Sequence, residues 1–272
     1  MLSSPHYTLK LPLKHRHFRH PDPHGSRDVR MIADAVTLHH EPAFMFTRSD
    51  SRQTGSTAKV SLLFLLYGVV HSLLASAAVK QGFARLMGER ARNGLYRPLY
   101  IGQSVLTTLL AAVVFQHLRD RDLYRIPRPW AWAFSLMQLA GIGLLLRALS
   151  VTGFDRILGL PQLVTYLRGG DPPPEAAAQG PPLQALKHPE KLGPFRRVRH
   201  PENLGVMLAL WAFPRMTVNR LALALWTSLY GILGSLHEDS RLKGAYGAAF
   251  DRYRRATPML VPRVGGPRNQ NG

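Results

Sequence analysis

The chain has 272 residues, 46% of them hydrophobic and none of them cysteine, which excludes disulfides, thiolate metal sites and cysteine nucleophiles. Its formal charge of +19 is spread over every connecting segment, which favours a membrane surface over nucleic acid as the partner. The apolar residues are gathered in blocks separated by segments rich in Arg, Pro and Gly. This distribution predicts an all-α polytopic membrane helix bundle with about five membrane helices, the last two forming a helical hairpin.

Residues 1–57 precede the first apolar block and lack the apolar core of a signal peptide. They are rich in Pro, Arg and His, which predicts a disordered basic arm and no metal site. Residues 58–150 then contain three apolar blocks, each close to the ~20 residues that cross a hydrocarbon layer. The predicted transmembrane helices are Val60–Val79, Leu99–Leu118 and Trp130–Ser150.

Residues 151–198 form a predicted cytosolic connecting loop, whose middle, 169–182, is a Gly/Pro/Ala segment unlikely to fold alone. The most basic juxtamembrane segments are the first loop, this third loop and the tail, and basic loops face the cytoplasm. Three spans place the first and third loops on one side, and a hairpin returns the tail to that side. We therefore expect an integral membrane protein of the bacterial inner membrane with a cytosolic, helical C-terminal segment.

The hairpin occupies residues 199–262 and is followed by a predicted disordered tail, 263–272. Pro201 suits the first turn of a helix, where a missing N–H costs nothing. The 13 residues from Pro201 to Phe213 would make about 20 Å of helix, too short for a layer of ~30 Å. A re-entrant or tilted hairpin is therefore expected, whose return arm brings Glu238 back beside His200.

Glu238 and Asp239 end the apolar return arm, where the partial negative charge of a helix C-terminus normally attracts cations. These acids need a cationic partner, and the candidates are Arg197, Arg199, Arg241 and a bound ligand such as S-adenosylmethionine. Its carboxylate could meet helix N-terminal amides near Pro201 with Arg199 and His200, and its ammonium or ribose could meet the acids. Taken alone, the pattern favours a structural interpretation over a functional one by about two to one.

The same residues resemble a known family. The pattern Arg-His-Pro-x-x-x-Gly from Arg199, the stretch Trp211–Thr217, Tyr230, Glu238-Asp239-x-x-Leu242, Tyr246-Gly247, Tyr253 and Val261-Pro262 are similar to the core of the isoprenylcysteine carboxyl methyltransferase-like superfamily. The nearest resemblance is to its bacterial methanethiol S-methyltransferase and NnrU-like members. Phe154-Asp155 through Gln162 also resembles a family stretch, with one extra residue. The resemblance covers roughly residues 60–262 and is specific over the last part.

This resemblance implies a multi-spanning membrane enzyme that binds S-adenosylmethionine in a cytosol-facing pocket. The cofactor-binding residues that it implies are Arg199, His200, Pro201, Gly205, Glu238 and Asp239. The expected substrate pocket includes Asn203, Trp211 and Tyr230. The family commonly has Tyr at Asn203, Glu at Asp239 and Arg at Ser240, so the aromatic contact and the substrate can differ here. No catalytic base is assigned, because a sulfonium methyl is electrophilic and a thiol ionises readily.

The predicted function is methyl transfer from S-adenosylmethionine to a small or lipophilic small-molecule acceptor, with a thiol preferred and membrane lipids as the surroundings. One alternative is a non-catalytic membrane protein that keeps the scaffold for lipid or partner binding. Another is isoprenylcysteine-type carboxyl methylation. A third, ranked lower, is a haem protein that uses His71 and His117, since a lone membrane histidine more often hydrogen-bonds a neighbouring helix.

Overall fold

The computed structural model describes residues 51–263, except 177, 189 and 190, and these residues belong to one compact unit, Ser49–Gly272. Most of them are helical. In chain order the elements are α2 (Ser51–Ala75), α3 (Ala77–Met87), α4 (Glu89–His117), β1 (Asp122–Arg125), α5 (Trp130–Thr152), α6 (Phe154–Leu158), α7 (Leu160–Leu167), α8 (Leu183–Lys187), the 3-10 helix η2 (Gly193–Arg196), α9 (Pro201–Trp211), β2 (Arg215–Thr217), α10 (Val218–Tyr246) and α11 (Ala248–Ala256).

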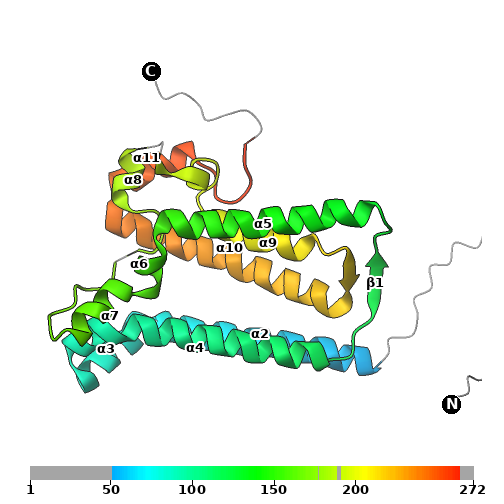
Figure 1. Cartoon of the computed structure of the whole chain (residues 1–272), viewed down its shortest axis with the longest axis horizontal. Coiled ribbons are helices and arrows are strands. Elements are labelled where there is room, and N and C mark those ends of the chain that lie inside the picture. Colours follow the sequence, from blue (N-terminus) through cyan, green and yellow to red (C-terminus); the bar gives the residue numbers. More distant parts are fainter. Residues whose placement is uncertain (1–50, 177, 189–190, 264–272) are drawn as a thin grey trace, which may run out of the picture. The chain divides into compact units, whose positions relative to one another are not determined.

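The long helices lie side by side in the spatial order α4, α2, α10, α9, α5 (Figure 1). Helices α9 and α10 are the predicted hairpin, and α9 packs most extensively on α5. The segments between α2 and α4, between α5 and α9, and after α10 all lie at one end of this unit (Figure 1). The predicted all-α membrane helix bundle is confirmed.

Among the described residues, three helices are long and apolar enough to cross a membrane, namely Gln53–Ala75, Glu89–His117 and Trp130–Thr152. The third agrees with the prediction, but the other two have different bounds. Helix α2 begins at Ser51, inside the predicted arm, and it ends at Ala75 because Ser76 adopts an extended conformation and caps α3 with its side chain. The rest of the arm, 1–50, and the tail from 264 lie outside the described residues.

The first predicted loop, 80–97, is helical. Helix α3 continues to Met87, Gly88 turns the chain with φ +86°, and α4 begins at Glu89, ten residues before the predicted second span. A positive φ is a conformation that glycine adopts without steric cost, so Gly88 is suited to this break. The basic residues of the first loop therefore project from helices instead of a flexible connection.

A two-stranded antiparallel sheet, absent from the predictions, joins two turns at the end of the unit away from α11 (Figure 1). Strand β1 follows α4 and strand β2 lies in the hairpin turn, with Asp122 opposite Thr217. This pairing gives the backbone groups of both turns hydrogen-bond partners and ties the hairpin to the connection between α4 and α5.

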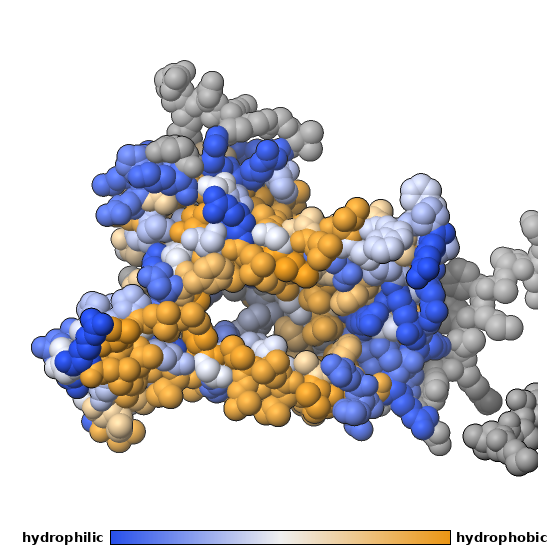
Figure 2. Space-filling model, viewed as in Figure 1, coloured by the Kyte–Doolittle hydropathy of each residue, from blue (hydrophilic) through white to orange (hydrophobic). Residues whose placement is uncertain are grey.

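The predicted connecting loop 151–198 is folded against the other end of the unit. It contains α6, α7, α8 and η2, and its Ala178 and Phe195 are buried with Leu242 and Phe250 in one hydrophobic cluster. The Gly/Pro/Ala segment thus becomes ordered by packing on α10 and α11. The sides of α2, α4 and α5 expose large apolar side chains, and polar residues gather at the two ends (Figure 2). This pattern is typical of a lipid-facing surface.

Candidate functional site

Arg199, His200 and Asp239 form one buried ionic network where the hairpin begins and ends. The Arg199 guanidinium donates to Asp239 Oδ2 from Nη2 at 2.6 Å, and His200 Nε2 lies 2.9 Å from Asp239 Oδ1. The structure thus brings an acid to His200, as the helix-length argument predicts, but the acid is Asp239 instead of Glu238. Successive residues of a helix point about 100° apart, so only one of the two acids can face His200.

This network fastens the C-terminal segment to the start of α9. Arg199 Nη1 donates to the carbonyl of Thr257 at 2.5 Å, and the Arg199 and His200 backbone N–H groups donate to Pro258 and Met259 at 2.8 and 3.1 Å. A buried charge is tolerated only when it is paired and hydrogen-bonded. Arg199 and Asp239 are therefore committed to holding three segments together.

The network also sets the charge of His200. Burial by itself would lower the pKa of His200, but hydrogen bonds to Asp239 and Glu202 outweigh burial and raise the pKa to about 9. Burial would likewise raise the pKa of Asp239, but hydrogen bonds from His200 and Arg199 lower it. At neutral pH the cluster consequently holds two cations and one anion from these three residues.

Glu238 faces a different part of the molecule. Its Oε1 accepts hydrogen bonds from the backbone N–H groups of Gln179 and Gly180 at 2.6 and 3.0 Å. Its Oε2 lies 4.0 Å from the Arg241 guanidinium. Glu238 therefore anchors the connecting segment over the end of α10, a partner that its position beside Asp239 in the sequence does not reveal.

Glu202 was not singled out from the sequence, yet its carboxylate is an unusual feature of the site. Its Oε1 lies 3.4 Å from His200 Nδ1, whereas its buried Oε2 has no hydrogen-bond partner among the described residues. A buried carboxylate oxygen without a donor is costly. The available signal was an acid inside the Arg-His-Pro motif, but an acid in a first helical turn is also an ordinary N-terminal feature.

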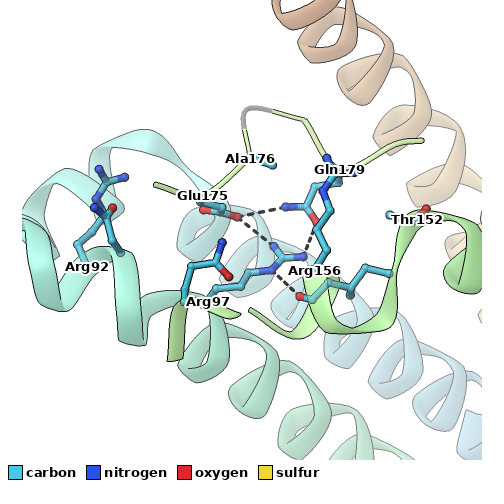
Figure 3. Close-up of a pocket in the computed structure, with 10 residues that line it drawn as sticks. Arg92, Arg97, Thr152, Arg156, Glu175, Ala176 and Gln179 are labelled. Atoms are coloured by element: carbon cyan, nitrogen blue, oxygen red, sulfur yellow. Dashed lines mark hydrogen bonds and ion pairs between the residues drawn. The ribbon is translucent and has the colours of Figure 1, made fainter. Parts of the chain in front are cut away.

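Arg97, on α4 within the first predicted loop, is the centre of a second polar cluster. Its guanidinium donates to the carbonyl of Ile157 at 2.7 Å, to Glu175 at 3.2 Å, and to the side chain of Gln179 (Figure 3). Lys80 also pairs with Glu175. These contacts tie α3 and α4 to the connecting segment that Glu238 holds from the other side.

Two spaces adjoin Arg97. The smaller, about 20 Å³, is bordered by Asn93 and Gln162, each with a buried side-chain oxygen that lacks a partner, and it has room for about one water molecule (Figure 3). The larger is a cavity of about 270 Å³ bounded by α2, α3, α4, the connecting segment and the end of α10. The cavity is lined by His71, Ala75, Lys80, Tyr96, Arg97, Tyr100, Ile101, Glu175, Gln179 and Arg241.

The three residues expected in the substrate pocket are separated by the structure. Tyr230 lies near the cavity wall, with its hydroxyl 3.1 Å from Ser72 Oγ and its ring edge-on to His71. Asn203 lies in the α9–α10 interface and donates to Ser235 Oγ at 2.9 Å. Trp211 lies at the far end of α9, about 16 Å along the helix from its start. Only Tyr230 is placed beside the cavity.

Gly205 and Pro201 have clear packing roles. Pro201 is the first residue of α9 and is buried. A Cβ on Gly205 would lie 2.5 Å from the Gly141 carbonyl oxygen, and a Cβ on Gly141 would lie 2.6 Å from the Gly205 carbonyl oxygen. The two glycines therefore let α5 and α9 approach closely, as small residues do between membrane helices. A Cβ on Gly143, by contrast, would meet nothing within 4 Å beyond the backbone of its own helix, so this glycine makes no comparable close contact among the described residues.

The haem alternative does not fit the structure. Both ring nitrogens of His71 are hydrogen-bonded to α4, Nδ1 to Ser104 at 3.1 Å and Nε2 to Tyr100 at 2.6 Å. His117 lies 13 residues beyond Ser104 on the same helix, or about 20 Å away, so the two histidines cannot share one iron. Within residues 51–263, no group of three or more His, Asp or Glu side chains could hold a metal ion, and the arm histidines lie outside the described residues.

Comparison with known proteins places the chain among several relatives. It is 29% identical over 219 residues to methanethiol S-methyltransferase 2 of Bradyrhizobium diazoefficiens, covering 77% of this chain and 75% of that protein. It is 25% identical to methanethiol S-methyltransferase of Pseudomonas deceptionensis, covering 74% and 71%, and 32% identical to nurim of Mus musculus, covering 64% and 63%. No family model and no solved structure matches the chain.

Proposed function

We propose that this chain, a relative of the methanethiol S-methyltransferases and of nurim and consistent with the isoprenylcysteine carboxyl methyltransferase-like family, is an integral membrane methyltransferase that uses S-adenosylmethionine. The proposed acceptor is small or lipophilic, with a thiol preferred. The proposed location is a bacterial inner membrane, with the C-terminal segment in the cytosol. The proposed partners are membrane lipids and not nucleic acid. The names of the relatives and the apolar helices support this proposal.

The observation that carries the proposal is the unpartnered carboxylate oxygen of Glu202. It lies beside His200, where the start of α9, the end of α10 and the C-terminal segment meet. S-adenosylmethionine carries an ammonium group and two ribose hydroxyls, which are the donors that such an oxygen lacks. A cofactor bound there would remove the cost of the unsatisfied group.

The residues present fit this cofactor when their tasks are divided. Glu202 offers an acceptor, and Glu238 places a second carboxylate on the segment around Gln179. Arg199 and Asp239 bind each other, so we assign them to positioning and not to direct contact. When bound, the cofactor supplies an electrophilic methyl group on a sulfonium. The protein then has to bind the reactants, orient them and exclude water from them.

The cavity supports a small acceptor. Its volume of about 270 Å³ lies just below the ~300–1,000 Å³ of typical ligand pockets. Its wall combines aromatic rings with cations, and it reaches Gln179, whose backbone N–H binds Glu238. A thiol of a few atoms fits this space more readily than an isoprenylated chain, which makes isoprenylcysteine-type carboxyl methylation the weaker alternative.

The decisive test is cofactor binding by the full chain in detergent. Calorimetry should show binding of S-adenosylmethionine to the wild type, and Glu202→Gln should weaken binding by at least tenfold in a sample that remains folded and monodisperse. Glu89→Gln is the matched control, because that acid is exposed and paired with Arg92 on α4. Absence of binding by a monodisperse wild-type sample would overturn the proposal.

A second experiment concerns the acceptor. Cells that express the chain are supplied with methanethiol, and dimethyl sulfide is measured in the headspace against Glu202→Gln cells. Equal output from both would reject the thiol and leave cofactor binding to be judged by calorimetry alone.

A non-catalytic membrane scaffold is the second candidate, because one observation favours it. Arg199, His200 and Asp239 satisfy one another's charges and bind the C-terminal segment without any ligand. A folded wild type that binds neither S-adenosylmethionine nor its demethylated product would support this candidate.

A further inference from the structure

A hydrogen-bonded pair, His71 and Tyr100, lies in the wall of the 270 Å³ cavity within two helices of membrane-spanning length. Its His71 Nε2 and Tyr100 hydroxyl oxygen are 2.6 Å apart. Ionisable residues inside a membrane protein are costly and are typically functional or paired. The proposed cofactor residues do not involve this pair, so it needs an explanation of its own.

The hydrogen bonds fix the state of the imidazole. The Ser104 hydroxyl donates its one hydrogen to the Tyr100 carbonyl at 2.9 Å, so Ser104 Oγ can only accept from His71 Nδ1, 3.1 Å away. With the proton on Nδ1, His71 Nε2 carries a lone pair and accepts the hydroxyl hydrogen of Tyr100. The geometry therefore presents a neutral histidine as a base behind a tyrosine hydroxyl that faces the cavity.

The surroundings of the pair favour an anion in the cavity. Lys80 of α3, Arg97 of α4 and Arg241 of α10 line it, against Glu175 in its wall and Glu238, which lies 4.0 Å from Arg241. The Arg97 guanidinium lies 5.7 Å from the ring centroid of Tyr100. The other titratable groups that face the imidazole are the phenols of Tyr67 on α2 and Tyr230 on α10. Excess positive charge beside the acceptor space stabilises a developing anion such as a thiolate.

We propose that Tyr100 and His71 form a proton relay that ionises a thiol acceptor in this cavity, an inference that rests on the proposed methyltransferase function. The S–H bond breaks and its proton moves to the Tyr100 oxygen, while the Tyr100 hydroxyl proton moves to His71 Nε2. The sulfur keeps the S–H electron pair and would use it to bond to the methyl group of the proposed donor. The bond from that methyl group to the sulfonium sulfur would break, and its electron pair would remain on the neutral, demethylated donor, which leaves. Tyr100 is neutral before and after, and the imidazolium returns its proton to water.

The relay assigns separate roles to the two residues. Tyr100 is the catalytic residue that contacts the acceptor, and His71 is a positioning residue that acts through it. A purely structural role, in which the pair only joins α2 to α4, would affect stability and would not depend on the acidity of the thiol. The acidity of the acceptor therefore distinguishes the two roles.

The kinetic test compares two acceptors in Tyr100→Phe and His71→Gln variants of the full chain in detergent. With an alkanethiol near pH 7, kcat/KM should fall on the order of 100-fold, the usual contribution of a positioned acid or base. A more acidic aromatic thiol is already ionised at this pH, so no proton has to be removed. With this acceptor the loss of kcat/KM should be less than about threefold. Raising the pH, which increases the fraction of thiolate in solution, should restore part of the alkanethiol rate.

Tyr67→Phe is the matched control, because Tyr67 also stacks on the His71 ring, with centroids 5.4 Å apart, but does not line the cavity. This variant should leave kcat/KM for both acceptors, and its dependence on pH, unchanged. A readout without cofactor is the absorbance titration of 4-nitrothiophenol bound to the protein. The bound thiol should ionise at lower pH in the wild type than in Tyr100→Phe.

The outcomes separate this inference from the function on which it rests. If the wild type methylates a thiol and Tyr100→Phe keeps its rate and pH profile, the relay is wrong and the methyltransferase proposal stands. The relay would also be wrong if the variants lost the same factor in kcat/KM with both thiols, or if the bound thiol ionised at the same pH in the wild type and in Tyr100→Phe. Either result would indicate that the pair has only a structural role. If the wild type binds no S-adenosylmethionine, the function fails and the relay fails with it.

Discussion

The two sides of the helix bundle are held together by opposite means. On one side α5 and α9 pack backbone to backbone, with Gly141 and Gly205 each leaving no space for a side chain. On the other side α2, α4 and α10 meet through polar contacts around a cavity, including His71–Tyr100 and Ser72–Tyr230. The close-packed side fixes the start of α9 and hence the ionic network. The hollow side leaves a space that a small acceptor can occupy.

This difference indicates how the molecule divides its tasks. Buried charges hold their geometry only on a rigid framework, and the glycine contact supplies that framework beside Arg199 and Asp239. A cavity that must admit and release a small molecule cannot be packed in the same way. Substitutions should therefore alter stability on the close-packed side and activity on the hollow side.

The largest expected effect is that of Asp239→Ala, which leaves the cations of Arg199 and His200 buried without their anion. Removing one partner of a buried ion pair costs about 3–5 kcal/mol, so thermal unfolding in detergent should shift strongly downward. Asp251→Ala is the control, because its pair with Lys243 lies at the surface, where solvent screening leaves little net stabilisation. Similar shifts for both variants would contradict a rigid ionic framework.

The second largest effect is a pH dependence from His200. Its pKa is raised to about 9 from the ordinary 6.5, so the stability it contributes is fully present below pH 6.5 and is lost as the pH rises through about 9. By linkage this amounts to about 3 kcal/mol at most. Unfolding midpoints between pH 6 and 10 should fall for the wild type and stay flatter for His200→Gln. A wild-type profile as flat as that of the variant would show that His200 is not charged in the folded state.

A smaller loss is expected from Gly205→Ala. The new methyl group would meet the Gly141 carbonyl at 2.5 Å, and such overpacking costs about 1–3 kcal/mol. The control is Gly143→Ala on α5, the helix that carries Gly141. Its new methyl group meets nothing within 4 Å, so this variant should be as stable as the wild type or slightly more stable. The measurement is the thermal unfolding midpoint of each variant in detergent. If Gly205→Ala is as stable as Gly143→Ala, the close packing of α5 on α9 is not what holds the hairpin.

The smallest stability effect should come from the hollow side. Tyr230→Phe removes the hydrogen bond to Ser72, and a hydrogen bond between membrane helices contributes about 0.6 kcal/mol on average. Its thermal midpoint should therefore barely move, whereas the KM for a thiol acceptor should rise if the ring and hydroxyl border the acceptor space. A large destabilisation with unchanged KM would reverse the division of tasks between the two sides.

Part of this site was predictable because it depends on lengths and charges. The 13 residues from Pro201 to Phe213 are too few to cross a membrane, so the hairpin had to return and bring an acid to His200. The expectation that this acid needs a cationic partner is met by Arg199. Which of two adjacent acids would do so depends on the rotation of α10 about its axis, and the structure selects Asp239 and turns Glu238 toward Gln179.

Other features were missed because their partners are far apart in the sequence. Strands β1 and β2 lie in two turns, where short polar segments give no alternating pattern. Arg97 looked like an ordinary loop cation, although Glu175 and Gln179, which it binds, lie in a segment without predicted structure. His71 was recognised as a histidine bonded to a neighbouring helix, but its lone pair and its cavity could not be inferred.

The sequence by itself determined the membrane bundle, its hairpin and the family resemblance, because apolar blocks, helix lengths and short motifs are local properties of the chain. Only the tertiary structure decided that Asp239 binds Arg199, that Gly205 packs on Gly141, and that His71 and Tyr100 border a cavity. These outcomes depend on how each helix is rotated and how closely it approaches its neighbours. Those quantities are set by packing among residues distant in the sequence, so no local pattern encodes them.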